Sequence, residues 1–189
     1  MKNKGRLFVI SGPSGVGKGT VCRELLKRNE DLKLSVSATT RTPRTEDTEG
    51  VTYFFKTREE FERMIEESAF LEWATYNGNY YGTPIAALEE RLNNGISVIL
   101  EIEAQGALEV MKKRPDAVSV FIAPPDKETL YERLKGRGTE SEEEIAKRIK
   151  AAEWELKQKE KYNYIVVNDD LDVAVAAIEK IMNSEKERI

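Results

Sequence analysis

The chain has 189 residues and a formal net charge of −4, which fits a single domain with room for small inserted lobes. Hydrophobic residues make up 40% of the chain and charged residues 34%, a balance that supports an apolar core without disulfide or metal staples. The negative charge argues against nucleic acid as a partner, and one Cys with no His argues against a transition-metal site. The sequence has no apolar run of membrane-spanning length and begins without an apolar signal segment, so we expect a cytoplasmic protein without a membrane partner.

Residues 6–20, RLFVISGPSGVGKGT, predict a phosphate-binding loop. The apolar run from Leu7 to Ile10 indicates a buried strand, and the residues after Thr20 indicate a helix. Between them, glycines allow successive backbone N–H groups to face an anion, the helix points its positive end at it, and Lys18 neutralises it. Gly19 stands where many such loops place Ser or Thr, so magnesium must be held by Thr20, by waters or by carboxylates elsewhere.

Strand-like and helix-like segments alternate along most of the chain. Strands are predicted at residues 96–102, 117–122 and 164–167. Three helices are predicted from their capping residues: Thr83 with Pro84 in the first turn, Asp126, and Ser141 paired with Glu144. A last helix is predicted to begin at about Leu171. This alternation predicts an α/β fold in which helices cover both faces of a parallel sheet, with ligands at the carboxyl ends of the strands.

Two segments depart from the alternation. Residues 37–82 begin with a polar stretch, continue with a predicted strand from Val51 to Phe55, and predict a short helix capped by Thr57 with Glu60. We interpret them as an inserted, strand-rich lobe. Residues 133–148, with two glycines and many charges, predict a mobile flap.

Eight motifs, in chain order, resemble those of the guanylate kinase family. They are GPSGVGKGT at 12–20, SATTRTPR at 37–44, EWA at 72–74, GNYYGT at 78–83, EIEAQG at 101–106, IAPP at 122–125, RLKGRGTE at 133–140 and VNDD at 167–170. The resemblance implies a three-layer P-loop kinase fold that transfers the γ-phosphoryl group of ATP to GMP, with dGMP as a further acceptor and Mg²⁺ as cofactor. It also implies a core of residues 1–36 and 83–189, a GMP-binding lobe at 37–82 and an ATP lid at about 137–141.

The resemblance also implies roles for individual residues. On the ATP side it implies Gly12, Pro13, Ser14, Gly15, Val16, Gly17, Lys18, Gly19, Thr20, Arg133, Arg137 and Asn168. On the GMP side it implies Ser37, Arg41, Arg44, Tyr53, Glu72, Tyr81, Thr83 and Glu101. The residues expected to act in catalysis are Lys18, Arg41, Arg133, Arg137 and Arg148, and the candidates near magnesium are Thr20 and, in its outer shell, Glu103.

The residue types suit these roles. Guanine presents two adjacent donors, N1–H and N2–H, which a carboxylate such as Glu72 or Glu101 can accept, whereas adenine presents a lone pair at N1. Planar guanidinium groups bind phosphate oxygens through paired hydrogen bonds, as expected of Arg41 and Arg44. The nucleophile is a phosphate oxygen that is already mostly ionised at neutral pH, so a chain without His needs no general base.

Each of these residues also has a plainer interpretation. Arg41 and Arg44 could belong to a solvated loop, Glu72 could be an exposed position of a half-buried strand, and Asn168 could cap the last helix. At the level of the whole protein, the alternatives are a non-catalytic module that binds phosphorylated peptides and a kinase for another nucleoside monophosphate. The complete phosphate loop argues against the first, and the Glu72 and Glu101 pair argues against AMP as the acceptor.

Overall fold

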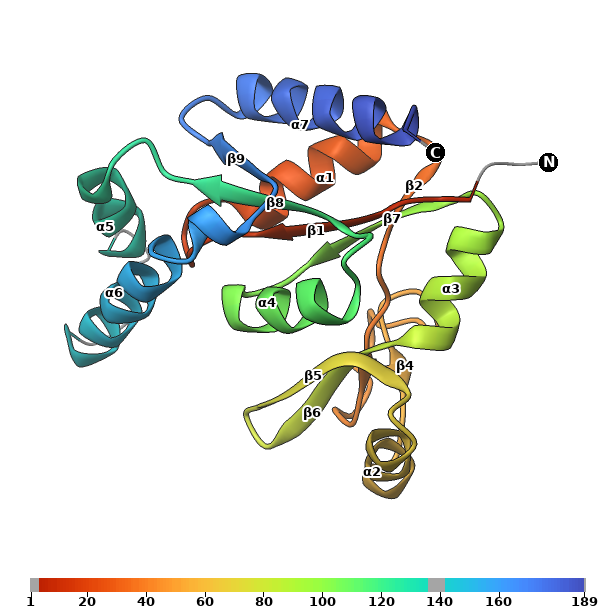
Figure 1. Cartoon of the computed structure of the whole chain (residues 1–189). Coiled ribbons are helices and arrows are strands. Elements are labelled where there is room, and N and C mark those ends of the chain that lie inside the picture. The colour runs from red at the N-terminus through yellow and green to blue at the C-terminus, as the bar shows by residue number, and fades with distance from the viewer. Residues whose placement is uncertain (1–3, 136–141, 189) are drawn as a thin grey trace.

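A computed structural model describes residues 4–135 and 142–188. Its centre is a five-stranded sheet in the order β2-β7-β1-β8-β9, and all neighbouring strands run parallel (Figure 1). The strands are β1 (Leu7–Ser11), β2 (Leu32–Leu34), β7 (Ser97–Glu101), β8 (Val118–Ala123) and β9 (Tyr164–Val167). The three strands predicted after residue 90 are confirmed to within a residue or two at each end.

Helices cover both faces of this sheet. They are α1 (Lys18–Arg28) and α7 (Leu171–Lys186) on one face, and α3 (Ile85–Asn93) and α4 (Ala104–Lys113) on the other. Strand side chains alternate, so Phe8 and Ile10 of β1 pack with α1 and α7, whereas Leu7 and Val9 pack with α3 and α4. The result is a three-layer α/β/α core, as predicted.

Two further helices lie near the carboxyl end of β8. They are α5 (Lys127–Lys135) and α6 (Glu142–Leu156), followed by the short helix η1 (Lys159–Lys161). Leu130 and Leu134 of α5 bury themselves against Ala152 of α6. The two ends of the predicted flap at 133–148 lie within helices α5 and α6, so the predicted segment is too long. Of its residues, 136–141 fall outside the described part of the chain. The proposed lid and the cap at Ser141 lie there too.

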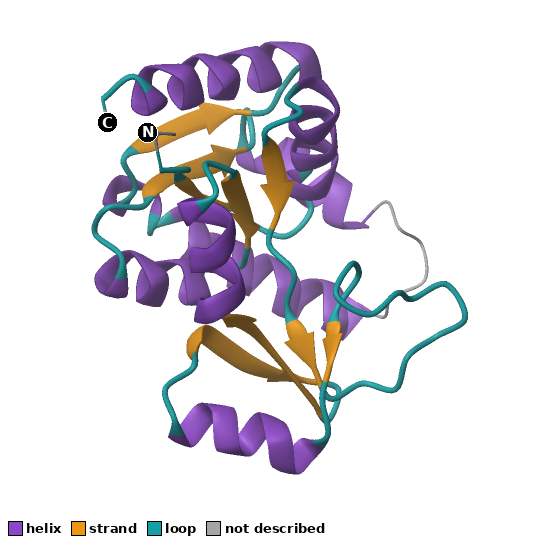
Figure 2. Ribbon diagram, turned by 90° about the vertical axis from the view of Figure 1, so that its right-hand side faces the viewer, coloured by secondary structure: helices purple, strands orange, loops and turns teal. Residues whose placement is uncertain are grey.

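Residues 37–84 form a second, smaller sheet in the order β4-β3-β6-β5 beneath the large one (Figure 2). Its elements are β3 (Ala38–Thr39), β4 (Phe54–Phe55), α2 (Arg58–Glu66), β5 (Phe70–Tyr76) and β6 (Asn79–Pro84). Ala38, Phe61 and Phe70 bury themselves between α2 and this sheet. The unit therefore has its own apolar core, separate from that of the large sheet.

Two local predictions in this region are wrong. The strand predicted from Val51 shortens to Phe54–Phe55, because Thr48 and Thr52 close a turn in which the Thr52 hydroxyl bonds both the amide and the carbonyl of Thr48. Thr83 does not cap α3: β6 continues through Pro84, which is itself the N-cap residue, so the Thr83 hydroxyl is free to serve another partner.

The capping box predicted for α2 is confirmed. The Glu60 amide donates to the Thr57 hydroxyl at 3.1 Å, and the Thr57 amide donates to the Glu60 carboxylate at 2.7 Å. Asp126 accepts from the Thr129 amide at the start of α5, as expected of a cap. In the described part of the chain, no helix has the length and apolarity that a bilayer crossing requires.

Candidate active site

The phosphate loop joins the carboxyl end of β1 to the first residue of α1. Gly17, the N-cap residue of α1, has φ 95°, and a Cβ there would lie 2.8 Å from the Asn168 side-chain nitrogen. Gly12 has φ 153°, and a Cβ there would lie 2.3 Å from the backbone oxygen of Ile122. Both positions therefore require glycine, for backbone conformation and for space. The strand and the helix predicted on either side of the loop are confirmed.

Lys18 lies at the centre of this loop and is only 8% exposed. Its ammonium donates to the carbonyl oxygen of Gly12 at 2.6 Å and to that of Pro13 at 3.3 Å. The carboxylate of Glu103 lies 3.5 Å away. The positive charge is thus already positioned inside the loop, next to where an anion would bind.

Gly19 faces a carboxylate. A Cβ at Gly19 would lie 3.4 Å from Oε1 of Glu101, so Glu101 stands beside the first turn of α1. Burial raises the pKa of Glu101, while the positive charges of Lys18 and Arg23 oppose that rise. Arg23 also donates to the Thr20 hydroxyl at 3.1 Å. The first turn of this helix thus carries the Thr20 hydroxyl, and the Glu101 carboxylate lies beside Gly19; both groups have oxygens of the kind that a hard cation prefers.

Glu101 and Glu103 do not both belong to a strand. β7 ends at Glu101, and Glu103 is the N-cap residue of α4, with φ −68° and ψ 155°. Glu103 also faces Glu155 of α6, and this second carboxyl group has a pKa raised to about 7 by burial and by its contact with Glu103. Glu101 and Glu103 thus have different neighbours, although both line the cavity described next.

A cavity of about 250 Å³ lies between the phosphate loop and the small sheet. Its described lining is Lys18, Ser37, Glu72, Ala74, Tyr81, Gly82, Leu100, Glu101, Ile102 and Glu103. Lys18, predicted to face ATP, therefore shares one space with four residues predicted to face GMP, Ser37, Glu72, Tyr81 and Glu101, although they lie far apart in the sequence. Arg41, Arg44 and Tyr53 lie outside this described lining.

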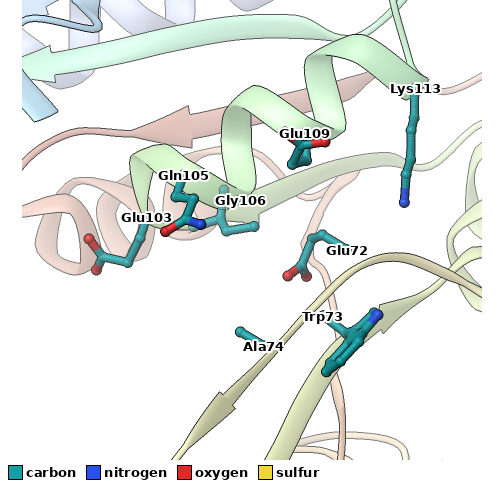
Figure 3. Close-up of a pocket in the computed structure, with 9 residues that line it drawn as sticks. Glu72, Trp73, Ala74, Glu103, Gln105, Gly106, Glu109 and Lys113 are labelled. Carbon is teal, nitrogen blue, oxygen red and sulfur yellow. The ribbon is translucent and has the colours of Figure 1, made fainter. Parts of the chain in front are cut away.

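Glu72 lies on β5 and points into the space between the two units of the fold (Figure 3). Its Oε1 accepts a hydrogen bond from the Thr83 hydroxyl at 2.7 Å. Burial raises the pKa of Glu72, and this bond and the charge of Lys113 oppose the rise. A second cavity of about 430 Å³ continues from Glu72 towards Gln105, Glu109 and Lys113 of α4. The carboxylate therefore lies beside enough space for a planar base.

Arg41 follows β3 and forms a second basic site. Its guanidinium carbon lies 5.3 Å from the ring centre of Tyr53, and the rings of Tyr53 and Tyr81 meet edge to face at 5.9 Å. Nη2 of Arg41 donates to Asp47 at 2.9 Å, and the same carboxylate accepts from the Arg44 backbone amide at 2.7 Å. These hydrogen bonds, with the Arg44 amide making the largest contribution, lower the pKa of Asp47.

Arg133, Arg148 and Asn168 converge on the phosphate loop from the other side. The side-chain amide of Asn168 donates to the backbone carbonyl of Val16 at 2.8 Å. The backbone carbonyl of Asn168 accepts from the Arg133 guanidinium at 3.3 Å. Arg148 donates to the Ser14 hydroxyl at 3.0 Å. The last helix is capped by Asp170, so the interpretation of Asn168 as its cap is wrong. Arg137 lies outside the described residues.

The sequence model of the guanylate kinase family matches residues 4–185. The chain belongs to the guanylate kinase family. It is 56% identical over 189 residues to the guanylate kinase of Caldanaerobacter subterraneus subsp. tengcongensis, covering 100% of this chain and 92% of that one. The guanylate kinase of Clostridioides difficile is 51% identical, over 98% of this chain and 91% of its own.

A solved structure supports the same assignment. The crystal structure of guanylate kinase from Anaplasma phagocytophilum matches with a TM-score of 0.72 and 36% sequence identity, over 98% of this chain and 88% of that chain. The guanylate kinase fold therefore extends along the chain, from the phosphate loop through the small sheet to α7.

Three site residues escaped the sequence reasoning. Asp47 pairs with Arg41, Arg23 holds the Thr20 hydroxyl, and Glu155 accepts from the amide of Ser14 in the phosphate loop. Arg23 lies three residues after Thr20 on a predicted helix, so helical spacing alone could have indicated it. Glu155 gave no local signal, because its partner lies 141 residues away.

Proposed function

We propose that this guanylate kinase family member transfers the γ-phosphoryl group of ATP to GMP in the cavity between the phosphate loop and the small sheet. The observation that carries the proposal is the lining of that cavity, where Lys18 faces the same space as Ser37, Glu72 and Tyr81. A kinase of two nucleotides must bring two anionic substrates together in line, and each needs its own positive site. The products are ADP and GDP.

On the ATP side, the loop amides and the N-terminus of α1 bind the phosphates, and Lys18 turns from the Gly12 carbonyl towards their oxygens. Arg148, which donates to the Ser14 hydroxyl, and Arg133 add positive charge that neutralises the negative charge on the oxygens of the transferred group. Asn168 supports the loop through Val16 and lies at the edge proposed for adenine. For Arg137 we retain the role in ATP binding and catalysis that the resemblance of its motif implies.

On the GMP side, Glu72 accepts from guanine, with Ser37, Thr83 and Glu101 completing the contacts to the base. The Thr83 bond supports this role, because it fixes one carboxylate oxygen and orients the other. Arg41, Arg44, Tyr53 and Tyr81 bind the phosphate, and residues 37–82 form the GMP-binding lobe. The bond from Arg41 to the Asp47 carboxylate supports this role, because the guanidinium already binds an anionic group.

Magnesium fits the start of α1. In the described residues no group of three or more acidic, Cys or His side chains is gathered for a metal. An ion held mainly by nucleotide phosphates and waters needs no such group. Thr20 and Glu101 are the side chains nearest to Gly19 that would hold it, and Glu103 lies further along, beside Lys18. The ion would neutralise charge on the phosphate oxygens.

The chain's own contribution is positioning and charge neutralisation. The attacking oxygen of GMP is already ionised at neutral pH, so no side chain has to remove its proton. Exclusion of water from the cavity would direct the phosphoryl group to GMP. The phosphopeptide-binding alternative leaves Lys18 and its loop without a use, and a different monophosphate would leave Glu72 facing a lone pair.

The test is an assay of ADP release with ATP and each of GMP, dGMP, AMP, CMP and UMP. We expect turnover with GMP, weaker turnover with dGMP, and values of kcat/KM for AMP lower by about 10⁴ or more. Absence of turnover with GMP would reject the enzyme. Equal efficiency with AMP would reject the role of Glu72 in base selection.

A further inference from the structure

Helix α6 holds the phosphate loop at one residue through two side chains. Arg148 donates to the Ser14 hydroxyl at 3.0 Å, and Glu155, two turns later, accepts from the Ser14 backbone amide at 3.3 Å. Seven residues make nearly two helical turns, so both side chains come from the same face of α6. One helix therefore makes hydrogen bonds to both the side chain and the backbone of Ser14.

Glu155 is a carboxylic acid buried beside apolar side chains. It is only 7% exposed, in a helix whose neighbouring residues Ala152 and Leu156 pack in an apolar cluster. A buried carboxyl group costs free energy unless hydrogen bonds satisfy it. Glu155 accepts one from the Ser14 amide, and its carboxyl group faces that of Glu103. Glu103 in turn lies 3.5 Å from the Lys18 ammonium.

Two buried hydroxyls lie close to this carboxyl group. Within the described part of the chain, Ser11 Oγ and Tyr162 OH have no hydrogen-bond partner, although both atoms are buried. The charges of Glu155 and Glu103 reach the Tyr162 hydroxyl and help to raise its pKa, after burial itself. The interior beside the loop thus holds other buried polar groups besides Glu155.

We propose that Glu155 is a positioning residue for phosphoryl transfer, which orients the phosphate loop through the Ser14 amide and fixes Lys18 through Glu103. The inference rests on the proposed function and names a further residue of the same site. Glu155 does not touch the reacting atoms. It acts on ATP through two intermediaries, one the loop residue Ser14, whose backbone amide donates to Glu155, and the other the carboxylate beside the loop lysine.

The geometry predicts which substitutions matter. Glu155→Gln keeps an acceptor for the Ser14 amide and offers an N–H to Glu103, so it reproduces both hydrogen bonds. Glu155→Asp keeps the acidic group but shortens the side chain by one methylene, so the carboxylate can no longer reach the Ser14 amide. A role in charge alone would favour Asp, whereas a role in hydrogen-bonded positioning favours Gln. The matched control is Glu153→Gln, an exposed carboxylate on the same helix that accepts from Tyr131.

The experiment measures kcat, KM for GMP and the dissociation constant of ADP for the wild type and the three variants, with urea unfolding to show that each is folded. For Glu155→Asp we expect kcat to fall and ADP to bind more weakly, each by about 10- to 100-fold. KM for GMP should stay within about 2-fold, because the GMP residues come from other elements. Glu155→Gln should stay within about 3-fold of the wild type in every parameter, and Glu153→Gln should match it.

Three results would overturn the proposal. They are an Asp variant as active as the wild type, a Gln variant as impaired as the Asp variant, and a rise in KM for GMP that matches the fall in kcat. An inactive wild type would instead reject the proposed function. The ADP measurement would then still decide the role of Glu155, because it needs no turnover.

Discussion

Lys18 illustrates how much of this site depends on single charges in a restricted space. Its ammonium is buried and bonded to two loop carbonyls, with Glu103 alongside. A buried ammonium is costly unless such groups surround it. The same groups hold it within reach of the phosphates, so position and charge are set together.

Lys18→Met should therefore lower kcat by about 100-fold or more, since it removes a charge directed at the transferred group while keeping a side chain of similar length. The measurement is the rate of ADP release at saturating ATP and GMP. Lys27→Met is the control, because Lys27 is an exposed residue of the same helix that bonds Glu24. A Lys18→Met variant with near wild-type kcat would show that the loop lysine has no catalytic role here.

Glu72→Gln should reduce selectivity for GMP. The amide would direct N–H groups at the donors of guanine, so kcat/KM for GMP should fall by about 100-fold or more, with KM for ATP unchanged. Glu109→Gln removes a carboxylate from the wall of the neighbouring cavity and should have little effect. If both variants lost the same activity, the general charge of the cleft would explain the loss better than contact with the base.

Glu155 should also make stability depend on pH. Its pKa of about 7 exceeds the ordinary value of 4.5, so the folded state binds the proton more tightly than the unfolded state. The free energy of unfolding should then fall as the pH rises from about 4.5 to 7, and level off above that. Urea unfolding at pH 5 and pH 8 measures the difference. Glu155→Gln should lose this part of the slope, and an unchanged slope would contradict the assignment.

For single residues, the sequence pattern predicted contacts within one motif. Contacts between residues far apart in the sequence could be identified only from the folded structure. The loop glycines and Lys18 are contiguous, and their spacing alone predicts their geometry. Asp47 and Glu155 are single acidic residues in segments already rich in charge. Only the folded chain shows that one meets Arg41 and the other meets Ser14.

The elements themselves were predicted well where burial dominates. The parallel strands are covered on both faces and read as continuous apolar runs, so β1, β7, β8 and β9 were evident in the sequence. Predictions failed where side-chain hydrogen bonds decide the backbone. Thr52 closes a turn that shortens β4, and Thr83 serves Glu72 instead of capping α3. Helix α4 was not predicted, because its N-cap residue Glu103 makes no side-chain capping hydrogen bond and the sequence shows no capping pattern there.

Thr57→Ala should destabilise the small unit through α2. It removes the hydroxyl that accepts from the Glu60 amide, and loss of such a cap costs about 1 kcal/mol. The free energy of unfolding in urea measures the effect. Thr57→Ser keeps the hydroxyl and should stay within about 0.5 kcal/mol of the wild type. Equal losses in the two variants would mean that packing of the Thr57 methyl group, and not the cap, stabilises α2.

The whole molecule consists of two units with separate cores that face each other across the cavity. The large sheet supplies the phosphate loop and Glu101, and the small sheet supplies Glu72 and Tyr81. Neither unit alone has both sets of residues. On the proposed function, the small sheet gives the acceptor a surface of its own, separate from the surface that binds the donor.

The central claim is that this cavity joins a phosphoryl donor to a GMP acceptor, and label transfer tests it most directly. The wild-type protein is mixed with ATP labelled at the γ-phosphate, Mg²⁺ and GMP, and the labelled products are separated. We expect the label in GDP, in an amount equal to the ADP formed. Label released as inorganic phosphate, or retained in ATP while GMP is present, would contradict the account.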